Sequence, residues 1–149
     1  MKSFTILTAS SILIAASLGT AHAATLDSDS ANVTMDVAKF ASLTNLDDFV
    51  LTTTDPDGSA GAVYTGSDNF NLESNTQVRV SLSGANMSNG SDSIATTYSI
   101  DSSGLIIDTA VDSVHNASHS VSAAATLGDI SAQKAGGYAS VITLTVSSL

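Results

Sequence analysis

The chain has 149 residues, and its 14 acidic residues against 4 Lys and Arg give a formal net charge of −10 at pH 7. Proteins that bind nucleic acid contact phosphates through Lys and Arg, so this charge argues against nucleic acid as a partner, and against anionic lipid for the same reason. The sequence contains no Cys, which excludes disulfides, zinc-thiolate sites and thiol nucleophiles.

The N-terminus predicts an export signal. Lys2 supplies positive charge, residues 4–18 are apolar, and Ala21-His22-Ala23 places small residues where signal peptidase requires them. The apolar run is shorter than the roughly 20 residues that cross a bilayer, which favours a cleaved signal over an anchor. We therefore expect residues 1–23 to be removed and the protein to be secreted or at the cell surface, with the periplasm as the alternative.

The mature chain is expected to form one domain behind a short leader. Residues 24–31 (ATLDSDSA) lack alternating large apolar side chains and predict a flexible, acidic leader. Residues 32–149 are enough for one core and too few for two well-packed ones. No segment within residues 32–149 is an apolar stretch long enough to span a bilayer, so we expect no direct membrane insertion.

A series of short segments has the alternation of apolar and polar residues, or the β-branched composition, that is typical of strands. In chain order they are residues 33–37, 49–54, 62–64, 70–72, 77–83, 94–100, 105–107, 118–125 and 138–146. Turn residues separate them at Asp55-Pro56-Asp57-Gly58, Asn89-Gly90 and Ser102-Ser103-Gly104. We expect a loop at residues 66–68, a hairpin over residues 98–107, and a loop or short helical turn over residues 108–117.

About seven to nine short strands without a convincing helix predict an all-β fold, an immunoglobulin-like Greek-key β-sandwich. An up-and-down barrel is the alternative. Uneven spacing and long stretches without hairpin signals favour the Greek-key connections.

Three segments carry a resemblance to known families: NVTMDV at 32–37, ESNTQVRVSLSG at 73–84 and KAGGYASVITLTV at 134–146. They resemble the opening, central and closing strands of bacterial secreted immunoglobulin-like sandwiches: spore coat protein U-like proteins, WxL-type surface domains and the pilins of alternate chaperone-usher fimbriae. The resemblance implies an extracellular structural or assembly role. If one subunit donates a strand to another, Asn32–Val37 is a better candidate than the leader, in which Leu26 is the only large apolar residue.

Asp55 and Asp57, followed by Gly58, imitate the start of a calcium loop, in which carboxylates at alternate positions converge. No Glu occupies the twelfth position, so an ordinary turn is favoured over a metal site. Calcium at Asp55 and Asp57, with help from Asp47 and Asp48, is the alternative. No other cofactor is expected.

His115 and His119 would share one face of a helix as metal ligands, but on an extended chain four residues span roughly 13 Å, too far for one ion. The sequence has no G-x-S-x-G nucleophile motif and no Gly-rich phosphate loop. We therefore expect that the protein is not an enzyme.

The function expected is that of a secreted, non-enzymatic structural subunit of a bacterial surface fibre, fimbria or extracellular matrix. It would assemble through β-strand edges with copies of itself or with other surface proteins. An adhesive or carbohydrate-binding module is the first alternative, although only Tyr64, Tyr98 and Tyr138 could stack on a sugar and there is no Trp. A soluble periplasmic protein is the second.

Overall fold

The computed structural model describes residues 27–55, 58–111 and 113–149; the predicted signal peptide lies outside them. The chain divides into two units, of which the second spans Val37–Leu149 and contains every described strand. In the first unit, described residues 27–36 form neither helix nor strand and are exposed. Among the described residues, no helix has the length and apolar character needed to cross a membrane.

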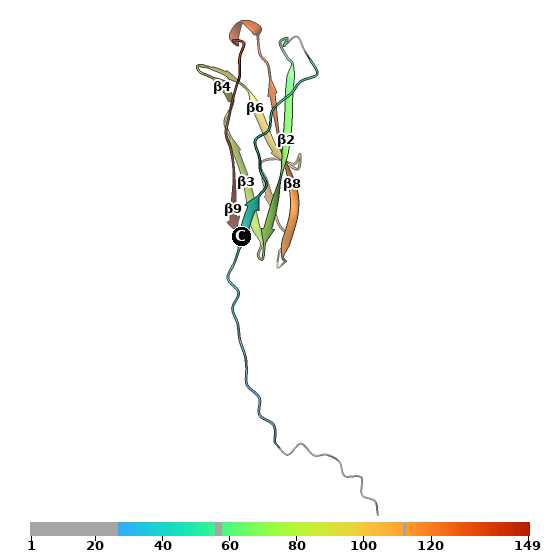
Figure 1. Cartoon of the computed structure of the whole chain (residues 1–149), viewed down its shortest axis with the longest axis vertical. Coiled ribbons are helices and arrows are strands. Elements are labelled where there is room, and N and C mark those ends of the chain that lie inside the picture. The colour runs from blue at the N-terminus through green and yellow to red at the C-terminus, as the bar shows by residue number, and fades with distance from the viewer. Residues whose placement is uncertain (1–26, 56–57, 112) are drawn as a thin grey trace, which may run out of the picture. The chain divides into compact units, whose positions relative to one another are not determined.

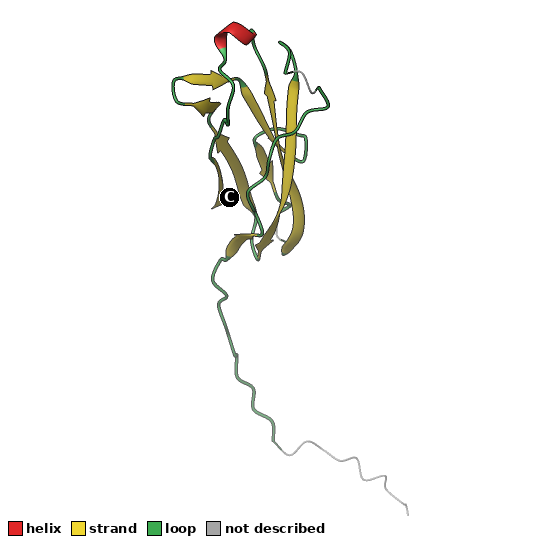
Figure 2. Cartoon of the chain, turned by 45° about the horizontal axis from the view of Figure 1, so that its top comes forward, coloured by secondary structure: helices red, strands yellow, loops and turns green. Residues whose placement is uncertain are grey.

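The regular structure described in the second unit consists of antiparallel strands and one short 3₁₀ turn, η1 (Ile130–Ala132), joined by loops (Figure 2). The strands are β1 (Ala41–Thr44), β2 (Val63–Ser74), β3 (Val78–Gly84), β4 (Met87–Asn89), β5 (Asp92–Ile94), β6 (Thr96–Ile100), β7 (Ile106–Asp108), β8 (His115–Thr126) and β9 (Ile142–Ser148). The all-β sandwich expected from the sequence is therefore confirmed.

The strands form two main sheets, with the order β1-β2-β8-β6 in one and β7-β3-β9 in the other; β4 and β5 form a small separate hairpin (Figure 1). In immunoglobulin domains one sheet has the order A-B-E-D and the other C-F-G. Taking β1, β2, β3, β6, β8 and β9 as A to F reproduces that order. Within the described residues, the position beside β9, where strand G would lie, holds no strand.

The core lies between the two sheets. Its buried residues come from the inward faces of β2, β3, β6 and β8, and they are Phe70, Leu72, Val78, Val80, Leu82, Ile100 and Val121. In β2 and β3 these positions are two residues apart, because successive side chains point to opposite faces of a sheet. The inward residues of β1 and β9 only partly join this core: Ala41, Leu43, Ile142, Leu144 and Val146 are half-buried.

Two predicted strands at the start of the domain are wrong. Residues 33–37 alternate as a strand should, yet they form none, and Val33, Met35 and Val37 are 95%, 83% and 71% exposed. Residues 49–54 form only an isolated bridge from Thr52 to Thr65. Alternation shows that a segment can bury one face, but it does not show which strand will pair with it.

The loop predicted at residues 66–68 is also wrong, since β2 runs through it without a break. Residues 65–68 pair with residues 121–124 of the central strand β8. Gly66 allows close approach here, because a Cβ at this position would lie 2.6 Å from the carbonyl oxygen of Val50. The glycine thus accommodates a crossing segment and does not end the strand.

Three further boundaries differ. The strand at 94–100 is divided between β5 and β6, and the expected hairpin over 98–107 is wrong because β6 pairs with β8 and β7 with β3. The turn itself exists, with Asp101 and Ser102 at φ of 48° and 57°. The last strand begins at Ile142, not at Tyr138. The strand at 77–83 and the Asn89-Gly90 turn are confirmed as β3 and the β4-β5 hairpin.

Candidate assembly edge

One long side of β9 has no hydrogen-bonding partner among the described residues. On the other side it pairs with β3 from Val78↔Ser148 to Gly84↔Ile142. Val78 and Leu82 turn their backbone groups toward β7, since the Val78 carbonyl accepts from Thr109 N and Leu82 N donates to the Leu105 carbonyl.

Antiparallel ladders alternate, so the residues of β3 between these positions bond to Thr143, Thr145 and Ser147 of β9. The N–H and C=O groups of Ile142, Leu144 and Val146 consequently point away from β3. We call the backbone of these three residues the β9 edge. Their side chains face the interior, so one short stretch of chain presents unpaired hydrogen-bonding groups and incompletely buried apolar groups together.

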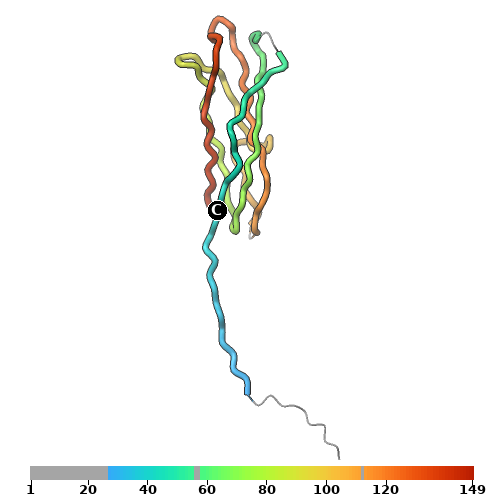
Figure 3. Tube along the Cα trace, viewed as in Figure 1, coloured from blue at the N-terminus to red at the C-terminus, as the bar shows by residue number. Residues whose placement is uncertain are grey.

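The strand that faces β9 from the other sheet is β1, and it is also an edge. Phe40 and Asn75 are bonded through the Phe40 carbonyl and Asn75 N, 3.2 Å apart, so Ser42 and Thr44 bond to β2 and Ala41 and Leu43 turn their backbone groups away from it. Figures 1 and 3 show β1 and the C-terminus of β9 at the same end of the sandwich.

After β1 the chain leaves β2 at Asn45, which has a φ of 64°, and returns to it at Thr52. Asn is one of the few residues that adopts this left-handed conformation at low cost. The intervening segment directs Leu46 and Phe49 against the core. Strand A of the sandwich is therefore interrupted, and the interruption forms one wall of an opening between the sheets.

Two adjoining cavities occupy this opening. A cavity of about 440 Å³ lies between residues 46–51 and residues 138–142, and one of about 600 Å³ continues toward η1. Both are lined by Phe49, Leu51, Met87 and Tyr138. We call the two cavities the edge groove.

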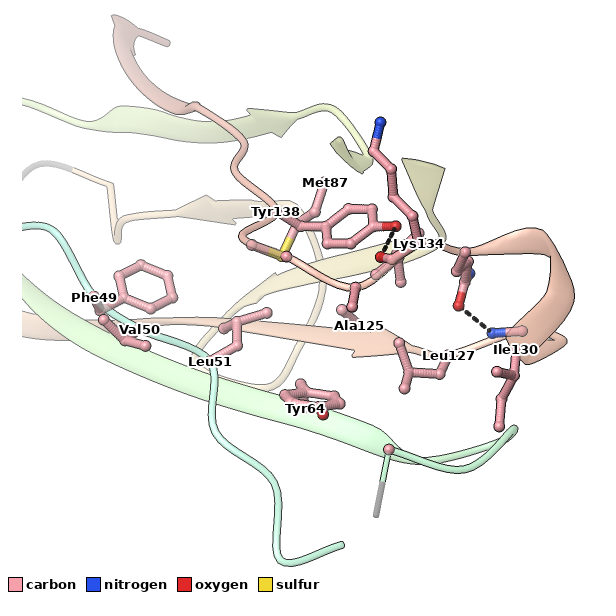
Figure 4. A pocket seen from close by; sticks show the side chains of 16 residues that line it. Phe49, Val50, Leu51, Tyr64, Met87, Ala125, Leu127, Ile130, Lys134 and Tyr138 are labelled. Atoms are coloured by element: carbon pink, nitrogen blue, oxygen red, sulfur yellow. Dashed lines mark hydrogen bonds between the residues drawn. The ribbon is translucent and has the colours of Figure 1, made fainter. Parts of the chain in front are cut away.

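The larger cavity is shown in Figure 4, where Phe49 and Leu51 come from one wall and Met87 and Tyr138 from the other. The Tyr138 hydroxyl is occupied, since it donates to the Lys134 carbonyl at 3.0 Å. The pKa of this hydroxyl is raised, first by desolvation and then by the negative charge of Asp92. The lining of the edge groove is mixed: apolar side chains line both cavities, Asp47, Asp48 and Ser140 also line the smaller one, and Gln133 and Lys134 also line the larger one.

The calcium candidates do not form a cluster within the described residues. The Asp55 carboxylate accepts a hydrogen bond from Ser59 Oγ at 3.1 Å, and Gly58 has a φ of 63°, as a local turn requires. Asp57 lies outside the described residues. Asp47 N donates to the carboxylate of Asp68, which holds the backbone of Asp47 against β2. Within the described ranges, no three His, Asp or Glu side chains come together as metal ligands would.

The two histidines lie on β8 and have separate partners. His115 Nε2 lies 3.1 Å from the Ala110 carbonyl, whereas His119 Nδ1 lies 2.7 Å from an Asp101 carboxylate oxygen. The His119 ring also stacks on Phe70, with ring centroids 5.4 Å apart.

Asp101 is the residue that this pair affects most. Desolvation raises its pKa, but the hydrogen bond from Ser120 N and the contact with His119 outweigh this and hold the pKa below its ordinary value. The contact between Asp101 and His119 holds the turn after β6 against β8, so its role is structural.

The sequence did not reveal the edge groove. Nothing in the alternation of residues 142–146 distinguishes a strand with two neighbours from a strand with one. The alternation of residues 33–37 was the one sequence signal for such a surface, because a segment patterned to bury one face needs a surface that covers it.

No protein-family model matches the sequence, and no curated protein matches it.

Proposed function

We propose that this protein is an exported, non-enzymatic structural subunit of a bacterial surface fibre, fimbria or extracellular matrix, and that it assembles through β-strand edges. The observation that carries the proposal is the vacant strand position beside β9, bordered by the edge groove. An unpaired edge next to incompletely buried apolar residues is a template for pairing with another chain.

The β9 edge lacks the features that keep the exposed edges of natural soluble monomers from pairing with other chains. Soluble β proteins protect exposed edges with charged side chains, Pro, bulges or a covering loop. The inward residues of β9 are Ile142, Leu144 and Val146, and none of these protections lies on them. A protein that works as a subunit has a reason to keep such an edge open.

The composition supports the same role. The net charge of −10 opposes nonspecific association, so assembly would depend on specific edge contacts. The tyrosines give less support to a carbohydrate-binding module, because Tyr64, Tyr98 and Tyr138 are each half-buried. The hydroxyls of Tyr98 and Tyr138 donate to backbone carbonyls, so these polar groups already have partners within the fold.

Light scattering coupled to size exclusion tests the proposal on the chain from Ala24 to Leu149, over a wide concentration range. We expect a concentration-dependent shift to large species. Leu144→Lys places a charge on the inward side of β9 and should abolish that shift, whereas Thr145→Lys on the exposed face should not. Circular dichroism establishes that both variants fold. A folded wild-type chain that remains a monomer at every concentration would refute the proposal.

A further inference from the structure

We propose that Tyr98 positions the first part of the β9 edge for assembly, by tying β6 to the point where the ladder between β3 and β9 ends. This inference rests on the proposed function and adds a residue that controls the shape of the edge from the opposite sheet. Tyr98 lies on β6, which belongs to the sheet that does not contain β9, and it also lines the smaller cavity of the edge groove.

The ladder between β3 and β9 ends at a β-bulge. Its last pair is Gly84↔Ile142, and the next contact between the same two stretches of chain joins Ser88 to Ala139. Residues 85–87 therefore lie between the two pairs on one strand, and only residues 140–141 lie between them on the other. A bulge is one extra residue on one strand of an antiparallel pair, and it locally disrupts the hydrogen bonds of the ladder.

At this bulge two side chains take the place of a backbone partner for the Ala85 carbonyl. The Tyr98 hydroxyl donates to the Ala85 oxygen at 2.6 Å, and Ser140 Oγ donates to the same oxygen at 2.7 Å. The two hydroxyl oxygens lie 3.0 Å from each other. A carbonyl that loses its place in a ladder needs such a donor, and its two lone pairs can accept both hydrogen bonds. The network thus joins β6 to both strands at the bulge.

The Tyr98 ring fits at this position because residue 84 has no side chain. A Cβ at Gly84 would lie 2.7 Å from Cε2 of Tyr98 and 3.0 Å from Cγ2 of Ile142. A glycine within a strand often marks such a close approach. The ring and the first inward residue of β9 therefore pack against the same glycine, which lets Tyr98 reach from one sheet to the other.

The network matters for assembly because Ile142 is the first residue of the β9 edge. The residue before it, Val141, is 81% exposed and makes no backbone hydrogen bond within the described part of the chain. The extended chain leading into β9 is held by the bridge between Ser88 and Ala139 and by the hydrogen bond from Ser140 to Ala85. The direction of the Ile142 N–H and C=O groups consequently depends on the network at Ala85.

The same hydroxyl fixes one wall of the edge groove. Tyr98, Ser140 and Ile142 line the smaller cavity on one side, and Leu46 and Phe49 line it on the other. Because the hydroxyl of Tyr98 holds the chain before β9 at a fixed distance from β6, it also fixes the position of this wall. A surface that is already ordered binds more tightly than one that must be ordered on binding. Tyr98 should therefore favour association through the order it gives to the edge.

The subunit can fold without this hydroxyl. Tyr98 is half-buried, and Ser140 still donates to the Ala85 carbonyl when the tyrosine hydroxyl is removed. The ring, which fills the space above Gly84, stays in place in a phenylalanine variant. Loss of the hydroxyl should therefore loosen the residues around the bulge more than it loosens the rest of the sandwich, which is the mark of a positioning residue.

Tyr98→Phe tests the inference, with Ser99→Ala as its matched control. Ser99 is the next residue of β6 and lies on the opposite face of the strand, where its Oγ is 2.7 Å from that of Ser122. Sedimentation velocity over a dilution series measures association, and circular dichroism establishes that both variants fold. We expect Tyr98→Phe to weaken association by about two- to tenfold, the effect of one hydrogen bond. Ser99→Ala should change it by less than about twofold, because its hydrogen bond lies away from the groove.

Amide hydrogen exchange of the dilute subunit separates positioning from a general loss of stability. The Ala139 amide is bonded to the Ser88 carbonyl, and Thr143 pairs with Ser83, so these two amides lie on either side of the bulge. We expect both to exchange about two- to tenfold faster in Tyr98→Phe than in the wild type, while the Ser147 amide at the far end of β9 is unchanged.

The outcomes are distinguishable. Wild-type association in Tyr98→Phe would overturn the inference and leave the proposed function standing. Equal acceleration at Thr143 and Ser147 would also overturn it, because a general loss of stability produces that pattern. If the wild-type chain itself forms no large species, the proposed function is removed, and this inference is removed with it.

Discussion

Replacing Met35 with Ala should weaken assembly strongly without affecting the folded subunit. Met35 is 83% exposed and lies in a segment without secondary structure, so its side chain contributes nothing measurable to the core of its own chain. If Asn32–Val37 is the strand that one subunit donates to another, the Met35 side chain becomes buried in the assembly.

The size of the effect follows from the area removed from water. Burial of a side chain of this size contributes about 1.5–3 kcal/mol. A factor of ten in the dissociation constant corresponds to about 1.4 kcal/mol, so Met35→Ala should weaken association by about 10- to 150-fold. Thr34→Ala, on the opposite face of the same segment, should change it by less than about threefold, as expected for a surface substitution.

Sedimentation velocity over a dilution series measures both variants, and thermal unfolding in dilute solution checks that the subunit itself is unchanged. Equal dissociation constants for Met35→Ala and Thr34→Ala would refute the reasoning, because they would show that the alternation of the segment has no role in association. A lowered melting temperature for Met35→Ala alone would contradict the claim that this residue is free in the monomer.

Three further predictions concern the core and the turn. Gly66→Ala should destabilise the subunit by about 1–3 kcal/mol in urea unfolding, since its Cβ would lie 2.6 Å from the Val50 carbonyl oxygen; unchanged stability would contradict the close packing of that segment on β2. Leu72→Ala should cost about 2–5 kcal/mol because Leu72 is fully buried. The stability difference between wild type and Asp101→Asn should be largest at neutral pH and vanish as pH falls through the lowered pKa of Asp101, because a carboxyl with a lowered folded-state pKa stabilises the fold only while ionised; urea midpoints from pH 7 to pH 2 measure it.

The sequence predicted the fold class because the strongest period-two segments became strands. Residues 77–83 became β3, and residues 118–125 became the middle of β8. These segments are central in their sheets, so they bury one face and their alternation is complete. The prediction failed where tertiary contacts determine the local structure. Gly66 was read as a loop residue, whereas in the structure it lies within β2 and leaves room for the segment at Val50 that crosses it.

The site was harder to predict because it is defined by a missing neighbour. Ile142, Leu144 and Val146 have the same pattern as an interior strand, and only the strand order reveals that one side is open. The segment at 33–37 was predicted as an opening strand and, if one subunit donates a strand to another, as the donated one. In the described chain it forms no strand.

The most direct test is site-resolved amide hydrogen exchange along β9, compared between the assembled chain and a chain that begins at Val37. The account predicts that the amides of Ile142, Leu144 and Val146 exchange fast in the shortened chain and slowly in the assembly, while those of Thr143, Thr145 and Ser147 are protected in both. Assemblies in which the first three amides still exchange fast would contradict the claim that the β9 edge is where subunits join.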